Sequence, residues 1–96
     1  MSYVHITRLA DITLGDYEQV RRSMGDEPIA GQVAHVVGRA DGELHIIDVW
    51  ASKADADRFA AERLFPAFER SGVRPGPNTS YTTFDADVAD VAGVVR

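Results

Sequence analysis

Two β-rich runs joined by an Asp-Gly pair restrict the folds open to this chain more than any other feature. The runs cover residues 32–39 and 43–51, and Ala40, Asp41 and Gly42 lie between them. Asp-Gly is a strong hairpin signal because both residues tolerate a positive φ. The two runs are therefore predicted to be antiparallel neighbours in one sheet.

The residues before this hairpin predict one strand and one helix. Residues 4–9 are rich in β-formers and are bounded by polar turn residues. Apolar residues at spacings of three and four follow, Thr13 or Asp11 can cap the start of the helix, and Gly25 ends the pattern. Residues 26–31 contain a proline and a glycine and are predicted to form a connector.

The residues after the hairpin predict a second helix with an interruption. Ser52 stands at the N-cap position, with Asp55 three residues later in a variant of the capping box. Pro66 lacks a backbone donor and clashes with the preceding turn, so a kink or a restart is expected around Phe65. Gly72 is a favourable residue for the end of this helix.

The complete order of elements indicates a ferredoxin-like α+β fold. A loop at 73–78 and a β-branched, aromatic strand at 79–84 follow the second helix, and the tail 85–96 is an edge strand, a strand donated to a partner, or disordered. This βαββαβ order predicts four antiparallel strands with both helices on one face, in a single domain over residues 1–96. The run HIIDVW is apolar on both faces, so something is expected to cover the second face of the sheet.

Length, charge and composition limit the partners and the location. A chain of 96 residues buries a modest core, so association with a second copy would stabilise it. The formal charge is -5, and no run of Lys or Arg could neutralise a row of phosphates, which argues against nucleic acid. The chain has no cysteine, no signal-peptide pattern and no apolar run of about 20 residues. A cytoplasmic protein without a membrane partner is therefore expected.

The segment VWASKADADRF carries a resemblance to a known family. A third strand that ends in DVW and leads at once into a helix containing Phe59 resembles the dimeric α+β barrel superfamily, which includes the antibiotic biosynthesis monooxygenase proteins. The resemblance covers residues 3–84. It implies that small ferredoxin-like subunits pair through their sheet faces as a homodimer. It also implies that Trp50 lines a cavity between the sheet and the helices of each subunit.

The hairpin register decides whether this strand carries a candidate catalytic pair. If the Asp-Gly pair forms a two-residue turn, counting back along the strands puts His35 opposite Asp48 and Val33 opposite Trp50. Directly opposed side chains have their β-carbons about 4.5–5.5 Å apart. A carboxylate at that distance would orient the imidazole and make it a candidate general acid or base.

Two alternatives to this catalytic pair remain open. A three-residue turn with a bulge would pair Arg39 with Glu43 and move His35 to the face opposite Asp48. Even in the favourable register, a His-Asp pair in a half-buried sheet can simply satisfy its own polar atoms.

Helical spacing adds further candidates for the wall of the cavity. Tyr17 on the first helix, and Phe59 and Arg63 on the second, can project toward the sheet as substrate-binding residues. An arginine aimed at a pocket would favour an anionic or enolate-like ligand. The alternatives are core packing for the aromatic residues, Trp50 included, and a surface salt bridge from Arg63 to Glu62 or Glu69.

Neither a metal nor an organic cofactor is predicted. His5, His35 and His45 occupy three different strands without the spacing of a metal motif. The haem-degrading relatives use a histidine on the second helix as the iron ligand, and residues 53–71 contain no histidine.

The resemblance implies a cofactor-independent monooxygenase. In such proteins the substrate, usually a phenolic or enolisable aromatic, supplies the electron to oxygen while the protein deprotonates and shields it. His35 would be the base, Asp48 its orienting partner and Trp50 the wall against which a planar substrate packs. Two other functions stay open: a non-enzymatic dimer that binds a small molecule or acts as a scaffold, and an isomerase or cyclase that keeps the His35 base without oxygen.

Overall fold

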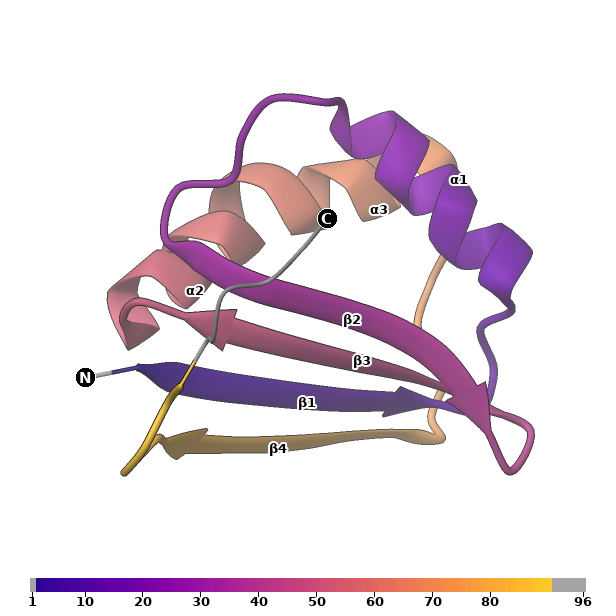
Figure 1. The fold of residues 1–96 in the computed structure, drawn as a ribbon. Helices are drawn as coiled ribbons and strands as arrows, with labels where there is room; N and C mark the ends of the chain where they lie inside the picture. The colour runs from indigo at the N-terminus through magenta and orange to yellow at the C-terminus, as the bar shows by residue number, and fades with distance from the viewer. Residues whose placement is uncertain (1, 91–96) are drawn as a thin grey trace.

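One antiparallel sheet with helices on a single face forms the structure (Figure 1). The computed structural model describes residues 2–90. The strand order is β2-β3-β1-β4, which confirms the predicted ferredoxin-like arrangement. In chain order the elements are β1 (Tyr3–Leu9), α1 (Leu14–Met24), β2 (Gln32–Ala40), β3 (Glu43–Trp50), α2 (Lys53–Phe59), the π-helical η1 (Ala60–Leu64), α3 (Phe65–Ser71) and β4 (Thr79–Asp85).

The first helix begins and ends where its capping residues predict. Thr13 is the N-cap, and its hydroxyl accepts a hydrogen bond from the Asp16 amide at 3.0 Å. The Asp16 carboxylate accepts one in return from the Thr13 amide, which completes a capping box. Gly25 ends α1 at a φ of 89°, a conformation that favours glycine.

The second helix begins at its predicted cap and is interrupted close to the predicted position. The Ser52 hydroxyl accepts from the Asp55 amide at 3.2 Å. The interruption takes the form of the π-helical turn η1, after which α3 begins at Phe65. Pro66 lies in the first turn of α3, and its missing N–H cannot bond to the carbonyl of Glu62. Gly72 ends α3 in the left-handed region.

The hairpin between β2 and β3 has the two-residue turn. Asp41 and Gly42 adopt φ values of 54° and 76°, and Ala40 pairs with Glu43. The three-residue alternative is therefore wrong.

One register prediction is also wrong. A bulge between Gln32 and Ala34 makes Gln32, and not Val33, the partner of Trp50. A bulge adds one residue to a strand, so the count back from the turn holds only as far as the bulge.

The two faces of the sheet differ in what covers them. The helices cover one face of the sheet (Figure 1). Leu9, Leu44 and Trp50 are buried on this face, where they line the space beneath the helices. The opposite face, called the outer face below, carries the side chains that alternate with them along the strands. Val36, Ile47 and Phe84 on the outer face are 57%, 39% and 47% exposed, and no element within residues 2–90 covers them. The predicted cover of this face is therefore not found in the described part of the chain.

The tail leaves the sheet after β4. The amide of Ala86 donates to the carbonyl of Ser2 at 2.8 Å, which extends the pairing of β4 with β1 by one bond. Residues 86–90 belong to no strand, and the remainder of the tail that was predicted to be an edge strand, donated or disordered lies outside the described residues. Within residues 2–90, none of the helices has the length and apolar character required to cross a membrane.

Candidate active site

A mostly apolar cavity of about 610 Å³ separates the helices from the sheet. This volume falls within the range of roughly 300–1,000 Å³ that is usual for small-molecule sites. All four strands and the helical layer contribute to its wall. Its apolar lining includes Val20, Met24, Leu44, Ile46, Trp50, Phe59, Leu64 and Phe68.

Three side chains from three elements form a hydrogen-bonded relay in the wall of this cavity. The Tyr17 hydroxyl on α1 lies 2.6 Å from His35 Nε2 on β2. His35 Nδ1 lies 2.5 Å from Oδ1 of the buried Asp48 on β3. Gln32 supports the carboxylate through Nε2, which donates to the same oxygen at 3.3 Å. The register therefore brings His35 and Asp48 together as the sequence predicts.

The carboxylate determines the direction of the hydrogen bonds in this relay. An ionised Asp48 can only accept, so Nδ1 of His35 carries the hydrogen of that bond. In the neutral ring, Nε2 then accepts from the Tyr17 hydroxyl. Burial raises the pKa of the Tyr17 phenol above its ordinary value of 10.0, while the neighbouring Arg21 opposes this rise. Tyr17 is therefore a protonated donor at neutral pH, and it can pass a proton to His35 as it receives one from a ligand.

An aromatic pair forms the wall beside the relay. The Trp50 ring is buried, and its centroid lies 5.1 Å from that of Phe59 with an angle of 40° between the planes. Both residues line the cavity, as the sequence predicts for them. The two inclined rings make this part of the wall apolar and polarisable, which favours an aromatic ligand.

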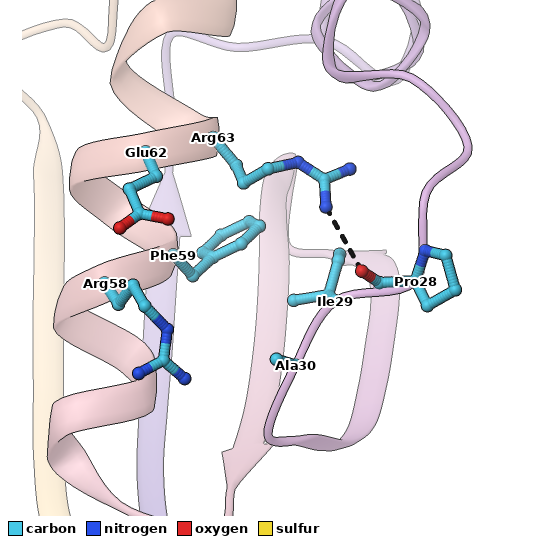
Figure 2. A pocket seen from close by; sticks show the side chains of 7 residues that line it. All are labelled: Pro28, Ile29, Ala30, Arg58, Phe59, Glu62 and Arg63. Atoms are coloured by element: carbon cyan, nitrogen blue, oxygen red, sulfur yellow. Dashed lines mark hydrogen bonds between the residues drawn. The ribbon is translucent and has the colours of Figure 1, made fainter.

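Arg63 lies in a different place from the other candidate residues. Its guanidinium donates to the carbonyl of Pro28 in the connector between α1 and β2, as Figure 2 shows. It also donates to the carbonyls of Glu27 in the connector and of Met24 at the end of α1. It also forms an ion pair with the Glu27 carboxylate at 3.6 Å, where Glu62 or Glu69 had been the expected partner. Arg63 lines a second, smaller pocket of about 160 Å³ together with Phe59 and the connector. Its guanidinium thus anchors the connector, and its contact with a substrate stays a prediction.

Comparison with solved structures identifies proteins of the same fold. Rv0793 from Mycobacterium tuberculosis matches 96% of this chain and 100% of its own, with a TM-score of 0.70 and 12% identity. SnoaB, a cofactor-independent oxygenase from Streptomyces nogalater, matches 92% of this chain and 95% of its own, with a TM-score of 0.65 and 18% identity. The chain has the fold of antibiotic biosynthesis monooxygenase-like proteins.

A third similar structure agrees with the first two. A protein from Caulobacter crescentus, provisionally assigned as an antibiotic biosynthesis monooxygenase, matches 88% of this chain and 89% of its own, with a TM-score of 0.64 and 12% identity. No protein-family model matches the sequence, and no curated protein does either. At such low identities the shared monooxygenase-like fold carries no residue roles across.

Sequence reasoning missed part of the polar lining of this monooxygenase-like fold. Gln32 reaches Asp48 only because of the bulge in β2, for which the sequence carries no visible signal. His5 and Thr7 on β1 also line the cavity. Their alternation along β1 is a signal that could have placed them on the helix-facing side. Within residues 2–90, no three His, Asp or Glu residues are grouped in a way that could hold a metal ion.

Proposed function

We propose that this protein is a cofactor-independent monooxygenase that oxidises a small phenolic or enolisable aromatic substrate. The observation that carries the proposal is the Tyr17–His35–Asp48 relay in the wall of an apolar cavity. A carboxylate-oriented imidazole is a good general base near neutral pH. The aromatic wall formed by Trp50 and Phe59 suits a planar ring.

The proposed reaction is balanced without an added reductant. The relay removes a proton from the substrate, and the resulting carbanion or phenolate gives an electron to molecular oxygen. Recombination of the two radicals forms a carbon–oxygen bond and a peroxide. For a substrate with an activated CH₂ group, one oxygen atom remains as a ketone and the other leaves as water, which carries the two hydrogens lost from carbon.

The cavity supports this chemistry in two ways. Its apolar walls exclude water from the carbanion, so that solvent does not protonate the intermediate. The buried Asp48 fixes the tautomer of His35, so that the basic nitrogen points along the relay. The likeness to SnoaB, which is described as a cofactor-independent oxygenase, agrees with a reaction that uses oxygen directly.

We also propose that the protein works as a homodimer whose two outer faces pack together. The strand pairing forms two neighbouring rows of apolar side chains on this face. One row crosses β2, β3 and β1 and contains Val36, Ile47 and Ile6. The other crosses β3, β1 and β4 and contains Val49, Val4 and Phe84. A second copy of this sheet would cover both rows. Contiguous exposed apolar surface of this kind is typical of an interface.

Oxygen uptake with a panel of hydroquinone, catechol and anthrone tests the function. We expect the wild-type protein to accelerate oxygen consumption with at least one of these compounds, and His35→Gln to lower the rate by about 100-fold or more because the base is lost. His45→Gln is the matched control, because the His45 imidazole bonds to the Ala40 carbonyl and not to the relay. Equal rates for wild type and His35→Gln would refute the proposed base.

Turnover without oxygen separates the competing functions. Conversion of an enolisable ketone under argon at the aerobic rate would point to an isomerase or cyclase. Binding without any turnover would point to a small-molecule-binding protein.

A further inference from the structure

A second imidazole, that of His5 on β1, lies in the same cavity beside the relay. The strand pairing matches His35 with Asp48, Asp48 with His5, and His5 with Thr83. These four side chains therefore form one row across all four strands, on the face that the helices cover. Neighbouring strands are about 4.8 Å apart, so His5 stands one strand from Asp48 and roughly 10 Å from His35.

The contacts of His5 leave one of its ring nitrogens available to a ligand. Its Nδ1 lies 3.3 Å from the hydroxyl of Thr7, two residues along the same strand. Within residues 2–90 no hydrogen-bond partner is found for its Nε2. The ring packs against Tyr81 with the centroids 5.7 Å apart, and Tyr81 is 60% exposed. His5 thus lies between the buried Asp48 of the relay and an edge of the cavity that, in the described part of the chain, meets solvent.

We propose that His5 is a further catalytic residue, which donates a proton to the oxygen-derived group while His35 removes protons from the substrate. This inference rests on the proposed monooxygenase function. Both ring nitrogens of His35 are bonded, to Asp48 and to Tyr17, whereas within residues 2–90 the Nε2 of His5 has no hydrogen-bond partner.

The proposed reaction uses both a base, which takes protons from carbon, and an acid, which gives protons to oxygen. After the carbon–oxygen bond forms, the peroxide anion takes a proton to become a hydroperoxide. Removal of the second proton from carbon then drives the carbon–oxygen double bond to form and the oxygen–oxygen bond to break. The departing hydroxide takes a proton and leaves as water. A single imidazole cannot be base and acid in the same step, so a second one at the oxygen end accelerates the collapse of the hydroperoxide.

The spacing of the two imidazoles matches this division of labour. With a planar substrate against Trp50 and Phe59 and its reacting carbon between the two imidazoles, the relay takes the proton from carbon on one side and His5 reaches the peroxide oxygens on the other. The protons that His35 removes pass to solvent, and His5 takes its replacement protons from solvent at the edge near Tyr81. The net proton count is therefore zero over one cycle.

Separate measurement of oxygen consumption and ketone formation with anthrone tests this role. We expect His5→Gln to consume oxygen at close to the wild-type rate, to accumulate hydroperoxide, and to form anthraquinone about 10-fold or more slowly. His35→Gln should lower both rates together, and His45→Gln should change neither. Anthraquinone formation by His5→Gln at the wild-type rate would overturn the inference.

A binding measurement keeps the role of His5 falsifiable if the wild-type protein oxidises none of the probes. That result would refute the proposed monooxygenase without deciding whether His5 meets a ligand. Alizarin, a planar hydroxylated anthraquinone, is then added while the imidazole signals of the three histidines are followed by carbon–proton NMR correlation. His5 and His35 signals that move together, with His45 unchanged, would support contact at both ends of the cavity. An unchanged His5 signal overturns the inference, whether or not alizarin binds elsewhere.

Discussion

Tyr17 joins the helical layer to the sheet through a single phenol–imidazole hydrogen bond. Burial raises the pKa of this phenol above 10.0, and the charge of Asp48 adds to the rise, while Arg21 opposes it. Between 10.0 and the higher pKa of the folded state, the unfolded chain has lost this proton and the folded chain retains it. The free energy of unfolding must therefore fall as the pH rises through that window.

Tyr17→Phe is expected to flatten this alkaline decline. The variant lacks the titrating phenol, so its free energy of unfolding should change less between pH 10.0 and the upper limit of the window. Urea denaturation at a series of alkaline pH values measures the slope, and tyrosinate absorbance follows the ionisation directly. A slope in the variant as steep as in the wild type would contradict a raised pKa for Tyr17.

Residue-level sequence reasoning succeeded where a local turn determines the geometry. The Asp41-Gly42 turn fixes which residues face each other. Counting residues back from this turn therefore predicted the pairing of His35 with Asp48. The contact between Tyr17 and His35 depends on how α1 is rotated above the sheet, which packing decides. The carbonyl partners of Arg63 depend on the path of the connector, which has no regular structure that a sequence pattern could predict.

At the scale of elements, the β2–β3 turn holds the register on which the relay depends. Gly42 has a φ of 76°, and no atom lies within 4 Å of the position that a β-carbon would take. Gly42→Ala therefore has no steric clash, and its cost is that of the left-handed backbone alone. We expect the free energy of unfolding, measured by urea denaturation, to fall by about 1–2 kcal/mol.

Gly38 provides a matched control within the same hairpin. It lies in the extended part of β2, and a β-carbon there would also meet nothing within 4 Å. Gly38→Ala should leave stability unchanged or raise it by up to about 1 kcal/mol, because alanine loses less backbone entropy than glycine in a strand. Equal losses for the two variants would show that the cost at Gly42 does not come from its positive φ.

The spacing of apolar residues in the sequence predicts the positions of the helices but not their local irregularities. The pattern located both helices and their caps, because capping residues act within one turn. The proline predicted an interruption but not its type, since a π-helical turn also depends on how α2 and α3 pack. The bulge in β2, which pairs Gln32 with Trp50, likewise has no signal in the sequence pattern.

At the scale of the whole molecule, a substitution on the outer face tests whether the protein is a dimer. Ile47 on the outer face and Leu14 on α1 are similarly exposed, at 39% and 38%. If two outer faces pack together, a charge at position 47 would be buried in the interface, whereas a charge at position 14 would remain in water. We therefore expect wild type and Leu14→Asp to sediment as dimers at micromolar concentration, and Ile47→Asp as a monomer.

Leu14→Asp is well suited as a control, because an acidic residue in the first turn of a helix is favourable. A stable wild-type monomer, or a dimer that only Leu14→Asp dissociates, would show that the outer face is not the interface.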